Sequence, residues 1–510
     1  MNKRYFTITI ILAALKLVLP FLLQDGVWEL HRDEYLYYAQ GQHVDFGYLE
    51  NPPMIGMLAW ISSLFGGSFF MIKLWPALFG ALTLVVVAQM IRELGGGVYA
   101  LLVAGLGMIF TAYLRIHFLF QPNFLEIFFW TLAAFFLVLF INTHHNKYLY
   151  LLSAALALGW WSKYSVLFFI TALVIALVLT RYRRLFLRVE FWKAVGLGLL
   201  IVLPNVLWQY QHNWPLVHHM DELHETQLRH INRADFIKEQ ILLLLPVLFV
   251  WIGGLIWYLR RREFRIIGLV YLGVVALLMV GSGKGYYTLG AYPMLLAAGG
   301  VWLERASARR RWLRIANVSL ILLLALPFVP VLIPMQKPAP MVAFNKEFKL
   351  EELGLLRWED LQNHPLQQDF ADMQGWREMA QKSERAYNSL PPQVQERTVV
   401  YCRNYGQAGA LKYYAQSRAF RSRVISDNGT HLLWIPDSLQ FEHLLFVGRR
   451  MPDADDEVFQ HFSQVRVLDS VINNLAREYG TKIILFQGAD TAAVRLANQS
   501  LNEEKRRFGR

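Results

Sequence analysis

Long apolar runs separated by short polar segments dominate the first two thirds of the chain. A helix that crosses the hydrocarbon core of a bilayer needs about 20 mostly apolar residues. Runs near that length, bounded by charged residues, Gly or Pro, cover residues 5–24, 71–92, 98–115, 122–141, 148–162, 165–180, 191–209, 240–259, 264–281, 285–303 and 312–333. The pattern therefore predicts an α-helical polytopic membrane protein with about 11 transmembrane helices.

The first long polar loop, residues 25–70, is expected to carry two short helices. Residues 53–65 are too few to span a bilayer and suit an interfacial helix. Residues 33–40 can form an amphipathic helix whose aromatic side holds Tyr35, Tyr37 and Tyr38. We expect both helices to lie at the membrane surface.

The pattern changes after residue 334, where hydrophobicity drops. Short β-rich runs at 398–402, 443–447 and 482–486 alternate with helical stretches. We predict a transmembrane module over 1–334 and a soluble α/β domain over 335–500. The charged tail 501–510 is expected to be disordered.

Orientation follows from the basic residues, because short cytoplasmic loops retain Lys and Arg. One set of alternate loops holds seventeen Lys and Arg residues, and the other set holds seven. The richer set is therefore assigned to the cytoplasm, together with the N-terminus. An odd number of spans then puts loop 25–70 and the C-terminal domain on the outer side, which is the periplasm if the membrane is a bacterial inner membrane.

Composition narrows the class of protein further. The chain is 55% hydrophobic and 17% charged, with a mean hydropathy of +0.31, which lies outside the range of ordinary soluble domains. Its net charge of +12 falls in the loops between apolar runs, so nucleic acid is disfavoured as a partner. The single cysteine, Cys402, excludes an intramolecular disulfide framework.

Carboxylates are concentrated in the loop 25–70. A negative, solvated loop is one interpretation; a general base is the other, because a hydroxyl that attacks an anomeric carbon must lose its proton. The acidic residues of the loop are Asp25, Glu29, Asp33, Glu34, Asp45 and Glu50.

Ionisable residues also mark the predicted outer ends of other helices. Glu126 begins one span, while Lys163 and Lys284 lie in two outer turns. Two cations suit a phosphodiester leaving group, whose developing negative charge they would stabilise. Each lysine alone could instead snorkel to water, which is also the interpretation for Lys16 inside the first span.

The loop 210–239 is rich in histidine and carboxylate. Such residues can hold a divalent ion that neutralises phosphate, but their spacing matches no defined site, and hydrated surface histidines are the favoured interpretation. The weak metal candidates are Glu50, His218 and His219.

Several motifs together carry a family resemblance. They are DEYLYYAQGQHVDFGYLENPPM, QPNFLEIFFWTL, LGWWSKYS, PNVLWQYQHNW with FIKEQILLLLP, GKGYYTLGAYP and RNYGQAGALKYYA. In these motifs the chain resembles the GT-C membrane glycosyltransferases of the bacterial, dolichyl-phosphate-mannose protein mannosyltransferase-like group (glycosyltransferase family 39), which includes the lipid A aminoarabinose transferases. The resemblance covers most of residues 1–440.

The resemblance implies an activity and its partners. It implies transfer of a sugar from a polyprenyl-phosphate donor, such as an undecaprenyl-phosphate sugar, by a single inverting displacement and without a nucleotide-sugar domain. The acceptor would be lipid A, another glycan or a protein. The sequence identifies no certain cofactor, and a divalent metal is the one candidate.

The resemblance also assigns roles to residues. Asp33 matches the catalytic base, Glu34 the second acid of that motif, and Glu126 an acid that helps orient the acceptor or the base. The substrate-positioning candidates are Glu50, Pro52, Pro53 and His218, and the donor phosphate-binding candidates are Lys163, Lys284, Tyr286 and Tyr287. Asn51 departs from the pattern, because aminoarabinose transferases favour a lysine there.

Two other classes of function are alternatives. A secondary transporter or flippase would also be a large bundle with intramembrane charges, but such folds commonly carry internal repeats, and none is visible in this sequence. A non-catalytic assembly factor would leave the acids and lysines at separate helix ends unexplained.

Overall fold

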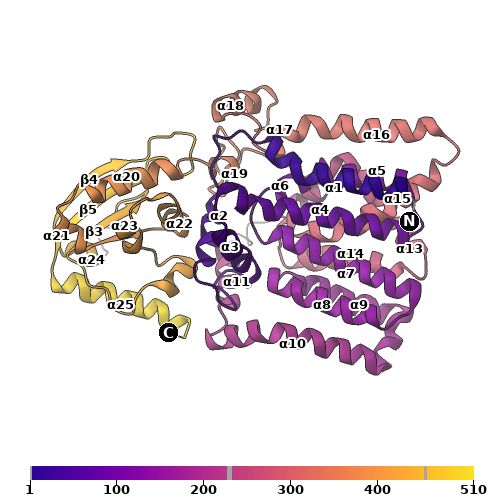
Figure 1. The fold of residues 1–510 in the computed structure, drawn as a ribbon, viewed down its shortest axis with the longest axis horizontal. Coiled ribbons are helices and arrows are strands. Elements are labelled where there is room, and N and C mark those ends of the chain that lie inside the picture. The colour runs from indigo at the N-terminus through magenta and orange to yellow at the C-terminus, as the bar shows by residue number, and fades with distance from the viewer. Residues whose placement is uncertain (1–2, 227–231, 453–456, 510) are drawn as a thin grey trace.

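The fold consists of a helical bundle with a small α/β domain at one end (Figure 1). The computed structural model describes residues 3–226, 232–452 and 457–509. The bundle helices lie side by side, and the short helices α2 (Arg32–Gln40), α3 (Met54–Leu64) and α11 (Pro215–Thr226) lie between the bundle and the domain. Both short helices predicted in the loop 25–70 are thus present.

Every predicted apolar run contains a helix. These helices are α1 (Lys3–Leu23), α4 (Phe69–Glu93), α5 (Val98–Ile109), α7 (Asn123–Thr143), α8 (Lys147–Ser162), α9 (Val166–Leu179), α10 (Val189–Gln211), α13 (Leu248–Arg260), α14 (Arg265–Val280), α15 (Tyr292–Ala306) and α16 (Arg311–Ala325). The connecting segments carry η1 (Arg181–Leu187), α6 (Tyr113–Ile116), α12 (Arg233–Leu242), η3 (Leu245–Val247), η4 (Gly285–Ala291), η5 (Leu326–Phe328) and α17 (Val329–Leu332).

Fewer of these helices are long enough to cross a bilayer than the apolar pattern predicts. Within the described residues, α1, α4, α7, α10 and the segment Arg311–Leu332 qualify by length and composition, which makes five. Two pairs of bent helices raise the number to seven, with bends of 103° after α9 and 68° before α13. The other predicted spans are interrupted by turns or are only 12 to 16 residues long, as α5 and α14 are.

Small residues allow close packing inside the bundle. A Cβ atom on Gly254 of α13 would lie 2.0 Å from the carbonyl oxygen of Leu295, and one on Gly299 of α15 would lie 1.9 Å from that of Val250. The backbones of α13 and α15 therefore approach each other closely, as is usual for helices packed in a membrane.

Lys16 corrects one expectation. Its side chain is fully buried and its Nζ donates a 2.9 Å hydrogen bond to the Tyr113 carbonyl oxygen. It does not snorkel to water, because the buried Tyr113 carbonyl oxygen, which also accepts from the His117 N–H at 3.1 Å, provides an acceptor inside the bundle.

The C-terminal domain contains a five-stranded sheet in the order β2-β1-β3-β5-β4. β1 (Thr398–Cys402) pairs in parallel with β2 (Val424–Ile425) and β3 (His443–Gly448), while β5 (Lys482–Ala489) pairs antiparallel with β3 and β4 (Phe462–Ser470). The three predicted strands are confirmed. The domain's helices are α18 (Pro338–Glu347), α19 (Gln368–Ala371), α20 (Trp376–Asn388), α21 (Pro392–Glu396), α22 (Tyr405–Tyr414), α23 (Arg418–Arg423), η6 (Gly429–Trp434), α24 (Glu457–Gln460) and α25 (Thr491–Arg507).

The tail is ordered further than expected. α25 continues to Arg507, so the prediction of disorder is wrong for residues 501–507. Leu501 and Lys505 are buried, and the Lys505 Nζ lies 2.9 Å from Asp437. Charge density alone predicted disorder, whereas these contacts with the domain stabilise the helix.

Candidate active site

Asp33 lies in the first turn of α2, where the bundle meets the C-terminal domain. The Tyr405 hydroxyl, from the first residue of α22, donates a 2.7 Å hydrogen bond to Asp33 Oδ1. Gln121 Nε2 donates a 3.0 Å hydrogen bond to Asp33 Oδ2. Two parts of the chain that are distant in sequence therefore hold one carboxylate.

Asp33 is both accessible and electrostatically suited to stay ionised. Its side chain is 27% exposed. Burial alone would raise the pKa of the Asp33 carboxyl, but His31, Arg32 and the Tyr405 hydrogen bond outweigh it and lower that pKa below its usual value. Asp33 is thus a carboxylate with access to solvent and a clear preference for its charged form.

A continuous hydrogen-bond chain links Asp33 to the ionic residues at the neighbouring helix ends. Gln121 Oε1, next in the chain, accepts from Asn123 Nδ2 at 3.3 Å, and Asn123 Oδ1 accepts from Lys163 Nζ at 2.7 Å. Lys163 Nζ also lies 3.1 Å from Glu126 Oε2. The structure therefore brings together Asp33, Glu126 and Lys163.

Lys163 lies at the C-terminal end of α8 and is 20% exposed. Its Nζ lies 4.3 Å from the centre of the Tyr287 ring and 5.9 Å from that of Tyr286. The Ser165 hydroxyl donates to the other oxygen of Glu126. The lysine is accordingly fixed by a carboxylate and two aromatic rings. Three of the four donor phosphate-binding candidates therefore lie together.

Lys284 belongs to a second chain of charges, which involves the C-terminal domain. Its Nζ lies 3.7 Å from Glu359, which also contacts Arg477 at 3.2 Å. Arg477 in turn lies 3.0 Å from the buried carboxylate of Asp372. Lys284 therefore faces the C-terminal domain.

Tyr37 lies one helical turn after Asp33 on α2. Burial raises the pKa of its hydroxyl, and electrostatic interactions with Asp33, Tyr405 and Glu50 raise it further, as does Tyr287. The hydroxyl therefore stays protonated and can donate or accept a hydrogen bond near the Asp33 carboxylate.

Glu34 occupies a different environment from Asp33. It is fully buried, and Lys73 Nζ contacts both of its oxygens at 2.7 Å. The backbone N–H groups of Phe120 and His31 donate to it at 2.6 Å and 2.7 Å. Its oxygens are occupied by these donors, so Glu34 fixes the start of α2 and does not face the solvent.

Glu50 connects the loop to the domain. Its Oε1 accepts a 2.6 Å hydrogen bond from the Thr430 backbone N–H, its Oε2 accepts from the Thr430 hydroxyl, and Gln40 Nε2 lies 3.4 Å from Oε2. Asn51 pairs its amide with that of Gln40, at 2.9 Å and 3.1 Å, and donates to the Pro52 carbonyl at 2.9 Å. Pro53 precedes the first residue of α3.

The metal candidates do not assemble into a site. His218 is exposed and packs edge-on against the Phe508 ring, with ring centres 5.7 Å apart. Burial lowers the pKa of His219, and Glu50 partly opposes this shift. Across the described residues, no three His, Cys, Asp or Glu side chains are placed to hold a metal ion; residues 227–231 of the histidine-rich loop lie outside them.

Several residues of the site were not singled out from the sequence. Gln121 and Asn123 lie in the QPNFLE motif, and Tyr405 lies in the RNYGQAGA motif. Lys73 could have been found as a charged residue within a predicted span, since such residues usually mark function or a buried pair. No local pattern pairs Tyr405 with Asp33, which is 372 positions away.

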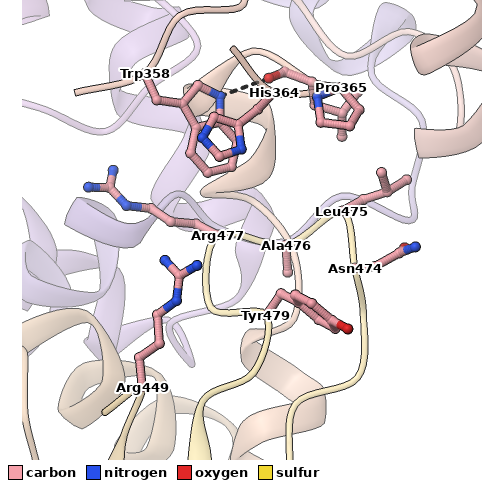
Figure 2. Close-up of a pocket in the computed structure, with 10 residues that line it drawn as sticks. Trp358, His364, Pro365, Arg449, Asn474, Leu475, Ala476, Arg477 and Tyr479 are labelled. Carbon is pink, nitrogen blue, oxygen red and sulfur yellow. Dashed lines mark hydrogen bonds between the residues drawn. The ribbon is translucent and has the colours of Figure 1, made fainter. Parts of the chain in front are cut away.

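A separate cavity lies within the C-terminal domain beside Arg477 (Figure 2). It has a volume of about 70 Å³ and is lined by Arg449, Arg477 and the stacked rings of Trp358 and His364, whose centres are 3.6 Å apart. Asp33 does not line this cavity, which is therefore distinct from the carboxylate site.

Part of the chain matches a known protein family. Residues 50–208 match the family model described as dolichyl-phosphate-mannose-protein mannosyltransferase. This segment includes Glu50, Glu126 and Lys163. No curated protein matches the chain.

Solved structures share the whole fold. ArnT from Cupriavidus metallidurans in the apo state is 16% identical, with a TM-score of 0.64 over 94% of this chain and 98% of that one. The same protein bound to undecaprenyl phosphate is 14% identical, with a TM-score of 0.62 over 95% and 98%. The resemblance predicted from the motifs, a GT-C-type membrane bundle followed by an α/β domain, is confirmed.

Proposed function

With the GT-C fold and the family match of residues 50–208 as premises, we propose that this chain is a membrane glycosyltransferase that uses a polyprenyl-phosphate-linked sugar. One observation carries the proposal: the hydrogen-bond chain that joins the accessible carboxylate of Asp33 to the ammonium group of Lys163. Sugar transfer from a phosphodiester requires a base and a cation within one site. ArnT, which has this fold, was solved with undecaprenyl phosphate bound.

Asp33 is the proposed general base. Its carboxylate accepts the proton of the acceptor hydroxyl while that oxygen forms a bond to the anomeric carbon, and the bond from that carbon to the phosphate oxygen breaks. Attack opposite the leaving group inverts the anomeric centre. The lowered pKa of Asp33 supports this role, since the base must be ionised before the acceptor binds.

Lys163 and Lys284 are the proposed partners of the donor phosphate. Lys163 is held by Glu126 and Asn123 before any donor arrives, so little ordering is required when phosphate binds. Tyr286 and Tyr287 flank it and can donate hydroxyl hydrogen bonds to phosphate oxygens. Lys284 is held by Glu359 of the C-terminal domain.

The remaining acids have positioning roles in this proposal. Glu34 holds the start of α2 through Lys73, and Glu126 holds Lys163. Glu50 joins the loop to the C-terminal domain, while Pro52 and Pro53 direct the chain into α3. His218 lies on α11, between the bundle and the C-terminal domain.

The proposed location is a bacterial inner membrane with the site on the periplasmic face. A polyprenyl donor presents its phosphate at the membrane surface, where the short helices α2 and α3 lie beside the bundle. The acceptor belongs to the envelope as a lipid, a glycan or a protein.

The test is transfer of radiolabel from a polyprenyl-phosphate sugar to any envelope acceptor in membranes that contain or lack this chain. Asp33→Asn should abolish transfer while the protein still folds. Asp25→Asn is the matched control, because Asp25 lies in the same loop and contacts only the nearby Val27 N–H through its side chain in the hydrogen bonds described. Wild-type transfer by Asp33→Asn would overturn the base assignment, and transport of a solute without any transfer would favour a transporter.

A further inference from the structure

A second cavity lies where the loop after α2 meets the C-terminal domain, and Asp33 does not line it. It has a volume of about 180 Å³ and lies between the loop after α2, the end of α10 and η6 of the C-terminal domain. The lining residues used below are His43, Asp45, Tyr48, Trp208, Thr430 and Trp434. At about 30 Å³ per water molecule, the cavity corresponds to about six waters, which is the size of one sugar ring.

Aromatic rings from both parts of the protein form its walls. The His43 ring, from the loop, stacks on the Trp434 ring of η6 with centres 4.3 Å apart and planes inclined by 16°. Trp208 stacks on His212, with centres 4.1 Å apart. A Cβ atom on Gly47 would lie 2.4 Å from the Trp208 ring, so the loop backbone lies directly against that ring.

Trp208 also carries an unused donor. Its side chain is only 4% exposed, and its Nε1–H has no hydrogen-bond partner among the described residues. A buried donor without a partner costs free energy. Because the Nε1 atom is itself buried, Trp208 contributes an apolar wall to the cavity.

The charge of the lining selects the chemistry of the ligand. Asp45 is the one acidic or basic residue among the described lining residues, apart from the histidine His43. Its Oδ1 accepts from the Phe46 N–H at 2.7 Å, and a carboxylate has further lone pairs for ligand hydroxyl groups. The negative charge of Asp45 repels phosphate, whereas the positive charges of Lys163 and Lys284 attract it.

We propose that this cavity is a subsite for one neutral sugar unit of a glycan acceptor. The partly exposed rings of His43 and Trp434 suit the apolar face of a sugar, while the exposed Asp45 carboxylate suits its hydroxyl groups. The inference rests on the proposed function, because it supplies the acceptor class of the same site.

The cavity is separate from Asp33, so it fits a glycan unit other than the reacting one. Asp33 and Gln40 lie seven residues apart on α2, which corresponds to about 10 Å along the helix. Gln40 contacts Glu50, and Glu50 binds Thr430 at the cavity wall. A glycan bound there would place a unit further along its chain, and not the sugar in the cavity, at Asp33.

The experiment uses the full-length protein in detergent and measures binding by calorimetry. The probes are the neutral trisaccharides cellotriose, maltotriose and chitotriose, with glucose 6-phosphate as the anionic probe. We expect saturable binding of at least one trisaccharide and none of glucose 6-phosphate. Trp434→Ala should weaken trisaccharide binding by about tenfold or more, and Asp45→Asn, which keeps the size of the side chain, should also weaken it.

Trp192→Ala is the matched control, because Trp192 is exposed at the opposite end of α10 from Trp208. Binding of no trisaccharide, or equal binding by the Trp434→Ala and Trp192→Ala proteins, would overturn the subsite. Asp33→Asn should bind the trisaccharide normally. If the wild type binds trisaccharides but transfers no sugar, the proposed function fails and the glycan site stands; if it transfers sugar and Trp434→Ala changes nothing, only the subsite fails.

Discussion

The Tyr405 hydroxyl donates a 2.7 Å hydrogen bond to Asp33 Oδ1 across the boundary between the bundle and the C-terminal domain. Arg32 donates to the same hydroxyl, so the Arg32 guanidinium, the Tyr405 phenol and the Asp33 carboxylate form one hydrogen-bond chain. The N-terminal end of α22 is itself held by Glu478, which accepts from Gln407 at 2.8 Å and Asn404 at 3.3 Å. The C-terminal domain thus contributes directly to the environment of Asp33.

We expect Tyr405→Phe to impair catalysis more than folding. Loss of a hydrogen bond to a charged group is worth about 1.5–3 kcal/mol, so kcat should fall by about tenfold or more. The same bond helps to lower the pKa of Asp33. Its loss raises that pKa, and the acidic limb of the pH–rate profile should move to higher pH.

Transfer measured over a range of pH tests this expectation. Tyr401→Phe is the control, because the Tyr401 hydroxyl, on β1, donates to Asp427 and not to Asp33. An acidic limb at the wild-type position in Tyr405→Phe would contradict the electrostatic role of the hydroxyl.

The buried pair of Glu34 and Lys73 should respond to substitution as a unit. Lys73→Met leaves the fully buried Glu34 carboxylate without its cation, and removal of one partner of a buried pair costs about 3–5 kcal/mol. The double variant Glu34→Gln with Lys73→Met removes both charges, so its stability should recover in part. Thermal unfolding in detergent measures the cycle, and strictly additive losses would contradict direct coupling.

Much of the architecture could be predicted because the bilayer constrains it. Apolar length located all eleven predicted helical segments, and short β-rich runs located three of the five strands. Helix length was less predictable: α9 and α13 belong to bent pairs, and apolarity does not reveal a bend. The tail was mispredicted because Lys505 finds Asp437 and a buried position only in the folded domain.

The site was predictable by residue type but not by environment. Two adjacent acids in the sequence, Asp33 and Glu34, differ completely in structure, because adjacent residues on a helix point in different directions. One is open to solvent and the other is paired with Lys73. Partners such as Tyr405 depend on how the domain docks, which no local pattern encodes.

Lys163 should affect the donor more than the acceptor. Lys163→Met removes the ammonium group proposed to contact the donor phosphate, and we expect the donor KM to rise by about tenfold, in line with about 1.5–3 kcal/mol for a charge-assisted hydrogen bond. Lys163→Arg should retain part of the affinity. Lys147→Met is the control, because Lys147 is exposed at the other end of α8. An unchanged donor KM in Lys163→Met would remove the lysine from the donor site.

Glu50 should determine how firmly the C-terminal domain is docked. Thr430 presents two donors, its N–H and its hydroxyl, to the two oxygens of Glu50. Glu50→Gln replaces one of these oxygens by an amide donor, so one Thr430 donor loses its acceptor. A buried donor left unpaired costs about 1–3 kcal/mol. We therefore expect faster hydrogen exchange of the Thr430 amide and of η6, together with slower transfer, because Tyr405 belongs to the same domain.

Glu352→Gln serves as the comparison for this variant. Glu352 forms an exposed pair with Lys349 at 3.2 Å, and exposed pairs contribute about 0–1 kcal/mol. Hydrogen exchange should therefore be unchanged there and across η6. If Glu50→Gln also leaves exchange at η6 unchanged but reduces transfer, Glu50 acts on a substrate and not on docking, since only a docking role requires the domain to loosen.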